Sequence, residues 1–196
     1  MIKSTKNIAV LCILFASSAL LAQTPTFGKF SFSAGVGLVP TFLADNASVN
    51  TLPVNARITY QVNPSFNLSG FFGYSSSTSS SAFIISDGQQ SLVSNKMTMY
   101  GLRGELKKNL SKKFEVYGGA LLGFNQSDIR EFDQFTGETI NRDPEGPSPF
   151  NPNRSNTEWM YAGFVGSTFY LHKNIGLFAE VGYGISLLNT GVTVRL

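Results

Sequence analysis

Six charged residues lie in segments where every second residue is largely apolar, and each charge falls on the alternate positions. This placement is typical of ion pairing. Successive side chains of a β-strand point to opposite faces, so each charge belongs to the polar face of its strand. A charge confined on such a face must be paired or hydrogen-bonded, and three Arg can balance three Glu. We therefore expect an interior charge network. Its members are Arg57, Arg103, Glu105, Glu115, Glu180 and Arg195.

Two interpretations of this network stay open. In the first, the ion pairs hold a closed fold together and plug its interior. In the second, the same pairs set the resistance of a gated small pore. The sequence does not fix the strand register, so the partners within the network are not assigned.

Metal and phosphate chemistry finds little support in the chain. His172 is the one histidine, and no cysteine follows Cys12, so a zinc site is not expected. The glycine-rich stretches 35–37 and 118–123 lack the Gly-Lys-Ser/Thr ending of a phosphate loop. We expect these glycines to relieve crowding or to permit strand bending, and we expect no cofactor.

The first 22 residues have the pattern of a secretory signal peptide. Lys3 and Lys6 precede an apolar run at 8–21, and Ala22 marks the cleavage point. The run is shorter than the roughly 20 residues of a spanning helix, which disfavours an N-terminal membrane anchor. We therefore divide the chain into a cleaved signal peptide, 1–22, and one domain, 23–196. Without Lys3 and Lys6, 13 basic residues face 12 acidic ones, so nothing suggests nucleic acid binding.

The composition of the 196 residues is unusual for a soluble domain. Charged residues make up 14%, against about 25% typically, while aromatics reach 13%. Eight segments alternate apolar and polar residues over about ten positions, as strands that cross a membrane do. They lie at 29–38, 54–62, 66–74, 98–106, 114–124, 158–171, 175–184 and 189–196.

The connections between these segments alternate in length. Those at 63–65, 107–113 and 172–174 are short, whereas those at 39–53, 75–96 and 126–156 are long; the seventh, near 185–188, is a short exception. Short periplasmic turns and long extracellular loops are typical of outer-membrane barrels. The sequence thus predicts an all-β fold: a closed, eight-stranded antiparallel up-and-down transmembrane barrel. Only 158–171 leaves its outward face ambiguous, because both parities carry apolar residues.

Aromatic residues on the apolar parity are expected to form two belts at the membrane interfaces. The sets are Phe30, Tyr60, Phe66 and Phe114 on the turn side, and Tyr74, Tyr100, Phe124 and Tyr183 on the loop side. The parity also tests the main alternative, a soluble barrel with an apolar interior that binds a ligand as lipocalins do. In that alternative Leu102 and Leu106 would point inward and Arg103 outward.

Segments 96–125 and 157–196 resemble the outer-membrane β-barrel domain proteins common in the Bacteroidetes group, relatives of small OmpA/OmpX-type barrels. The residues that carry the resemblance are "YGLRGELKKNLSKKFEVYGGALLGFN", "YLHKNIGLFAEVGYG" and "NTGVTVRL". The resemblance implies a location in the outer membrane of a Gram-negative bacterium and no catalytic activity. It also implies recognition of the last strand by the barrel-assembly machinery, although Leu196 stands where this class prefers a terminal aromatic.

Several surfaces are candidates for partners. Loop 126–156 holds six acidic residues, which suggests either a solvated surface or a divalent-cation or partner site beside lipopolysaccharide. Loop 75–96 carries an apolar stretch at 83–85 that could be a contact patch or could fold back on the barrel rim. The turns are basic, and their lysines could meet anionic inner-leaflet headgroups or could simply keep the turns soluble. Their lysines are Lys107, Lys108, Lys112, Lys113 and Lys173.

The sequence therefore predicts a non-enzymatic protein with a structural or surface-interaction role and a plugged interior. A narrow pore or transporter for small solutes is the first alternative. A lipid-modifying enzyme is a second, weaker one, because His172 lies in a predicted periplasmic turn, whereas such a Ser-His-acid site acts at the outer leaflet.

Overall fold

The computed structural model describes residues 30–41, 47–83, 90–140 and 154–196. The predicted signal peptide, residues 1–22, lies outside these ranges and stays a prediction. The described residues include no helix that is both long and apolar enough to cross a membrane. Eight strands make up the fold. They are β1 (Phe30–Gly37), β2 (Ala47–Asn63), β3 (Phe66–Phe83), β4 (Gln90–Asn109), β5 (Phe114–Asp133), β6 (Arg154–Tyr170), β7 (Ile175–Gly182) and β8 (Leu188–Arg195).

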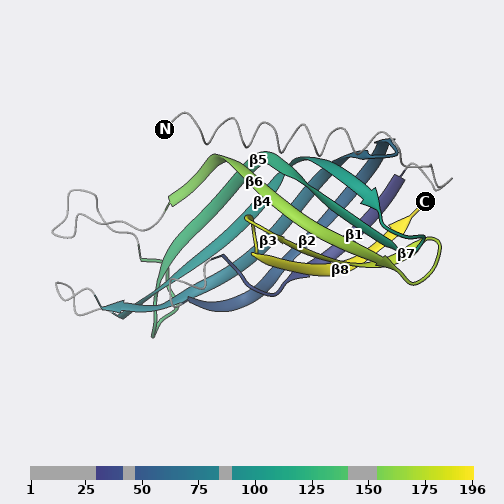
Figure 1. Ribbon diagram of the computed structural model, residues 1–196. Coiled ribbons are helices and arrows are strands. Elements are labelled where there is room, and N and C mark those ends of the chain that lie inside the picture. The colour runs from purple at the N-terminus through teal and green to yellow at the C-terminus, as the bar shows by residue number, and fades with distance from the viewer. Residues whose placement is uncertain (1–29, 42–46, 84–89, 141–153) are drawn as a thin grey trace, which may run out of the picture.

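The strands form a closed antiparallel barrel in chain order, as the sequence predicts. Each strand pairs with the next, and β8 returns to pair with β1, where Phe32 lies opposite Val194 and Ser33 opposite Thr193. The Ser33 and Thr193 hydroxyls are hydrogen-bonded across this seam at 2.9 Å. Closure leaves no unpaired edge at the level of β1 and β8, so the last strand has a neighbour on both sides (Figure 1).

The two faces of the barrel wall have opposite polarity. Leu102 and Leu106 are 61% and 52% exposed, whereas Arg103 and Glu105, which lie between them in the sequence, are 3% and 5% exposed. The predicted parity is confirmed, and the soluble barrel with an apolar interior is excluded. On β6, whose face the sequence leaves ambiguous, Trp159, Tyr161 and Val165 point outward and Ala162 and Phe164 inward.

The strands differ in length around the barrel. Strands β1, β7 and β8 have 8 residues each, whereas β2 to β6 have 17 to 20. In Figure 1 the long strands run well beyond the short ones at the end opposite to the C-terminus. Part of the barrel wall therefore projects as a sheet beyond the closed ring.

The predicted bounds of the long loops are wrong. Most of 75–96 belongs to β3 and β4, which continue to Phe83 and restart at Gln90, and β5 runs on to Asp133 instead of ending at 124. The pairing of Ser75 with Met97 and of Ser77 with Asn95 continues the ladder through this part of the chain. Residues 75–77 are serines at most 7% exposed, and because both parities carry serine the sequence shows no alternation there. Alternation therefore marks an apolar outer face and not strand length.

The turns at the other end are as short as predicted. They comprise 64–65, 110–113 and 171–174, with His172 exposed in the last of them. Some residues of the predicted aromatic belts are in ring contact: Phe30 with Tyr60 at 5.0 Å, and Phe124 with Tyr100 at 5.7 Å and with Trp159 at 4.3 Å. The belts at the membrane interfaces stay a prediction.

Candidate functional site: the charged interior

Glu180 of β7 is the centre of an ion-pair cluster inside the barrel. Its carboxylate receives two hydrogen bonds from Arg103 of β4, at 2.8 and 3.1 Å, and one from Nη1 of Arg57 of β2 at 3.0 Å. Nε of Arg103 also donates to Glu105 at 3.2 Å, and Glu105 lies 3.9 Å from Arg57. These four residues, Arg57, Arg103, Glu105 and Glu180, are here called the central cluster. Their side chains are 3 to 7% exposed, and two positive charges face two negative ones.

The central cluster joins strands that are not neighbours in the wall. Strand β7 pairs with β6 and β8, whereas Arg57 lies on β2 and Arg103 on β4. Glu180 therefore ties together distant parts of the ring across the interior. Because Arg103 binds it with two nitrogens in a fork, the pair fixes direction as well as distance.

Aromatic rings cover the guanidinium groups of the central cluster. The Cζ atom of Arg103 lies 3.6 Å from the ring centre of Phe164, and that of Arg57 lies 4.3 Å from the ring centre of Phe178. A cation held over a ring face is attracted by the ring's quadrupole, more strongly where water is excluded. This stacking explains why β6 carries an inward aromatic, which obscured its face in the sequence.

Tyr117 of β5 completes the central cluster. Its hydroxyl donates to Oε2 of Glu180 at 3.2 Å, and its ring lies 5.9 Å from Cζ of Arg57. The ring needs the space beside Gly166, where a Cβ atom would come within 2.7 Å of the Tyr117 ring and hydroxyl. Gly166 thus allows close packing inside the barrel.

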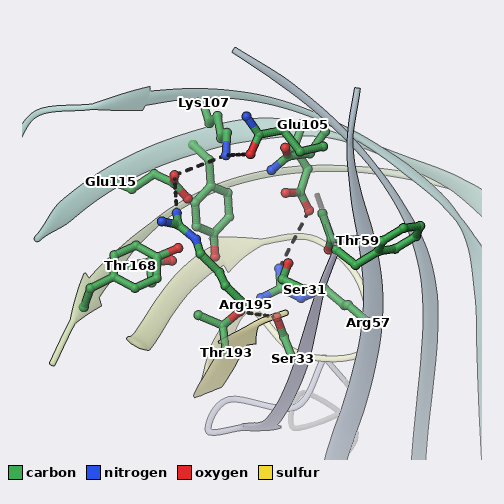
Figure 2. Close-up of a pocket in the computed structure, with 15 residues that line it drawn as sticks. Ser31, Ser33, Arg57, Thr59, Glu105, Lys107, Glu115, Thr168, Thr193 and Arg195 are labelled. Carbon is green, nitrogen blue, oxygen red and sulfur yellow. Dashed lines mark hydrogen bonds and ion pairs between the residues drawn. The ribbon is translucent and has the colours of Figure 1, made fainter. Parts of the chain in front are cut away.

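A second group of charges, the turn-side cluster, surrounds Glu115 at the end where the turns lie. Arg195 binds Glu115 at 2.9 Å and Lys107 approaches it to 3.5 Å, so that Glu115 lies between them (Figure 2). Lys107 also donates to Gln61 at 3.3 Å, and Arg195 stacks 3.8 Å from the ring centre of Tyr170.

Lys107 corrects the sequence prediction. It was expected in the turn at 107–113, facing lipid headgroups, but it lies on β4 with a side chain only 6% exposed inside the barrel. Its parity is that of Arg103 and Glu105, and that signal could have placed it. Lys108, Lys112, Lys113 and Lys173 are exposed.

Within the part of the barrel that the structure describes, a small cavity lies on each side of the central cluster. The turn-side cavity has a volume of about 40 Å³ and is lined by Arg57, Glu105, Lys107, Glu115 and Arg195, among others. The loop-side cavity has about 20 Å³ and is lined by residues that include Arg103 and Glu180. Each has room for only a few water molecules.

The connection between β7 and β8 covers the loop-side cavity. Ile185 is 2% exposed and lines that cavity, and Ser186 is 1% exposed. The Ser186 hydroxyl donates to the carbonyl of Val39 at 2.8 Å, and the Val39 amide donates back to it at 3.2 Å. These bonds hold an apolar side chain over the interior at the end opposite to the turns.

The acidic segment beyond the barrel shows other contacts. Asp128 pairs with Arg130 at 3.3 Å, and Asp133 accepts the amides of Phe135 and Thr136, both at 2.8 Å. The backbone N–H groups of Thr136 and Phe135 hold the pKa of the Asp133 carboxyl below its usual range. Across residues 30–41, 47–83, 90–140 and 154–196, no group of three acidic or His side chains is arranged to hold a metal ion. Asp143, Glu145 and the predicted contact residues Ile84 and Ile85 lie outside the described residues.

The comparisons identify the family. The profile of the family "Outer membrane protein beta-barrel domain" matches residues 8–194. The chain belongs to this family. It is accordingly an outer-membrane β-barrel protein of Gram-negative bacteria. No curated protein shows significant sequence similarity to it.

Solved structures of other small barrels are similar at low identity. A de novo designed transmembrane β-barrel matches with a TM-score of 0.49 and 17% identity, covering 90% of this chain and 100% of its own. Ail of Yersinia pestis, in complex with the heparin analogue sucrose octasulfate, gives 0.43 and 11%, with coverages of 85% and 92%. The N-terminal barrel domain of OprF from Pseudomonas aeruginosa gives 0.42 and 12%, with coverages of 87% and 100%.

Proposed function

We propose that this outer-membrane barrel is a non-enzymatic protein with a structural and surface-interaction role, and that its ion-pair network plugs the interior. The observation that carries the proposal is the central cluster, in which Glu180 binds Arg57 and Arg103 across the barrel. The cavities that border it have volumes of about 40 and 20 Å³. An interior filled in this way stiffens the wall and leaves no continuous aqueous path.

Planar lipid bilayers test the plug. Purified protein, after removal of a signal peptide proposed to end at Ala22, is expected to give no steady channels at moderate voltage. The control is the same preparation unfolded by boiling, which also checks folding through heat-modifiable gel migration. Steady conductance steps from the wild-type barrel would contradict the plug.

The surface role is supported by the projecting parts of β3, β4 and β5, with the segments 75–96 and 126–156 as the contact regions. We expect lipopolysaccharide and outer-membrane lipids to surround the wall, and the barrel-assembly machinery to insert it through β8. A deletion strain is expected to become more sensitive to detergents and to large antibiotics. Complementation by a barrel shortened at 75–96 and 126–156 separates the two roles. The shortened barrel is expected to restore resistance, because the barrel wall alone carries the structural role. It is expected to lose surface binding, because the contact regions are removed.

A narrow pore is the second candidate, and one observation favours it. The two cavities lie on opposite sides of the central cluster, so rearranged ion pairs would join them. Replacing Arg103 or Glu180 is then expected to open steady channels in bilayers, whereas replacing exposed Lys108 is not. If neither interior variant opens channels, the pore is contradicted and the structural role is the one that remains.

Enzymatic activity is not part of the proposal. His172 is exposed in the 171–174 turn, at the end opposite to the projecting strands. A lipid-modifying site would act at the other end of the barrel. Unchanged lipid A masses on expression are expected, and a mass shift lost in the His172→Ala variant would overturn this part of the proposal.

A further inference from the structure

Four exposed lysines gather on the outside of the barrel, at the end where the short turns lie. They are here called the basic turn patch and comprise Lys108, Lys112, Lys113 and Lys173. Two neighbouring turns supply three of them, because β5, which follows the turn at 110–113, pairs with β6, which precedes the turn at 171–174. The Tyr170 amide donates to the Lys113 carbonyl at 2.8 Å, which holds the two turns side by side.

The lysines of the basic turn patch have no acidic partners. None of the four forms an ion pair within the part of the chain that the structure describes. The turns at 110–113 and 171–174 contain no Asp or Glu. Glu105 and Glu115, on the adjoining β4 and β5, point into the barrel and are each 5% exposed. The side chains that these two turns present to solvent are therefore positive or uncharged.

Exposed apolar side chains lie beside these lysines. Leu110 and Leu171, one in each turn, are 58% and 57% exposed. Phe114 and Phe169 are paired at the adjoining ends of β5 and β6, and Phe169 is 46% exposed. Lysines next to exposed leucines and an aromatic ring are typical of a membrane interface, where the apolar groups enter the acyl region and the ammonium groups reach the headgroups.

We propose that the basic turn patch binds anionic phospholipid headgroups, of the phosphatidylglycerol type, in the leaflet on the turn side. Short turns of outer-membrane barrels are periplasmic, so this leaflet is the inner one. Each ammonium group is attracted by the negative surface potential of such lipids, over a range that salt limits. The occupant is a lipid and not a soluble anion, because Leu110 and Leu171 lie exposed beside the lysines and need an apolar contact. The proposal requires the location in the outer membrane but neither the plug nor the surface role.

The single tryptophan of the sequence, Trp159, allows one measurement to compare the two ends of the barrel. It lies on the loop side, where it is 71% exposed on the outer face. The double variant Trp159→Phe/Leu110→Trp moves this reporter to the basic turn patch. In vesicles of phosphatidylcholine mixed with brominated phosphatidylglycerol, quenching of the fluorescence gives the binding constant of the anionic lipid relative to the zwitterionic one beside each reporter.

The reporter at 110 is expected to show a roughly threefold or greater preference for phosphatidylglycerol, and Trp159 a ratio of about one. Adding Lys112→Gln, Lys113→Gln and Lys173→Gln to the double variant removes three charges and is expected to bring the ratio at 110 down to about one. Lys96→Gln is the matched control, because Lys96 is also an exposed lysine of β4 but lies toward the loop end. It should leave the ratio at 110 unchanged.

Salt gives a second test, which still decides if the lysine variants fail to fold by heat-modifiable migration. Raising sodium chloride from about 0.1 M to about 1 M shortens the screening length from about 10 Å to about 3 Å, and it is expected to abolish the preference at 110. Equal ratios at the two reporter positions would overturn the proposal. So would a ratio at 110 that salt leaves unchanged, or one that the lysine variants and Lys96→Gln change alike.

Discussion

The central cluster and the turn-side cluster use the same residue types under different conditions. Glu180 has two arginines, one of them bidentate, and a tyrosine hydroxyl, all deep in the ring. Glu115 has one arginine and one lysine near the turns, and the Arg195 side chain is 11% exposed. The first cluster is held by a bidentate pair deep in the ring, whereas the second is held by single contacts near the turns.

This difference teaches where the interior depends most on its ion pairs. Removing Glu180 from the central cluster leaves a buried guanidinium group without a carboxylate of its own. In the turn-side cluster Glu115 keeps one cation when the other is removed. Variants in the two clusters should therefore differ in cost.

The largest effect is expected for Glu180→Gln. The change leaves Arg57 and Arg103 with one carboxylate, Glu105, for two buried guanidinium groups. The free energy of unfolding is expected to fall by about 3 kcal/mol, measured by urea unfolding from lipid vesicles. Glu158→Gln on exposed β6 is the control and should change it by less than about 0.5 kcal/mol. Equal costs for the two variants would refute the role of the central cluster.

A smaller effect is expected for Gly166→Ala, which acts where the two clusters meet. Tyr117 bonds to Glu180 and also lines the turn-side cavity, and a Cβ atom at 166 would come within 2.7 Å of its ring and 2.9 Å of the Ala179 carbonyl. Overpacking of this kind costs about 1–2 kcal/mol in the same unfolding assay. Gly163→Ala on the same strand is the control, since a Cβ there meets nothing within 4 Å. A larger loss of stability in Gly163→Ala than in Gly166→Ala would show that the close packing of Tyr117 against Gly166 is unimportant.

Arg195→Gln should cost less than Glu180→Gln, about 1 kcal/mol. Glu115 keeps Lys107 at 3.5 Å, so the carboxylate is not left alone. The comparison variant is Arg130→Gln, whose exposed pair with Asp128 is worth little in water. A loss at Arg195 as large as that at Glu180 would mean that the two clusters contribute equally to stability.

The sequence predicts the parity of the wall well and its height poorly. Leu102, Arg103 and Glu105 alternate because lipid lies on one side and a packed polar interior on the other, so two solvents impose the pattern. After Tyr74 the apolar parity ends. The serines that follow are buried and pair as a strand without any alternation, so the sequence predicts a loop where β3 continues.

The sequence also predicts which charges lie inside but not how they are balanced. The six predicted residues all occupy the interior. Lys107 also lies there and shares the parity of Arg103 and Glu105, but the sequence predicts a turn at this position. Which charges pair depends on the strand register and on how far each side chain extends across the ring, as for Glu180 with Arg57 and Arg103. The sequence of a single strand indicates neither. The inward Phe164 was missed for a related reason, because a ring that covers a guanidinium group resembles a lipid-facing residue in sequence.

The smallest effect is expected at Asp133, where a carboxylate lies in water and neither cluster is involved. The amides of Thr136 and Phe135 donate to it and lower its pKa in the folded protein. Because the folded pKa lies below the unfolded value of about 3.9, the bonds contribute fully above that pH and are lost as the pH falls through the folded pKa. The protection of the amides at 135 and 136, measured by NMR as exchange relative to the intrinsic rate at each pH, is therefore expected to fall only below about pH 4, whereas Asp133→Ala should lack this protection throughout. The barrel itself should stay folded over this range in both proteins, since the turn lies beyond the ring; unfolding of the wall in Asp133→Ala would show that the projecting strands support the closed barrel and do not merely extend from it.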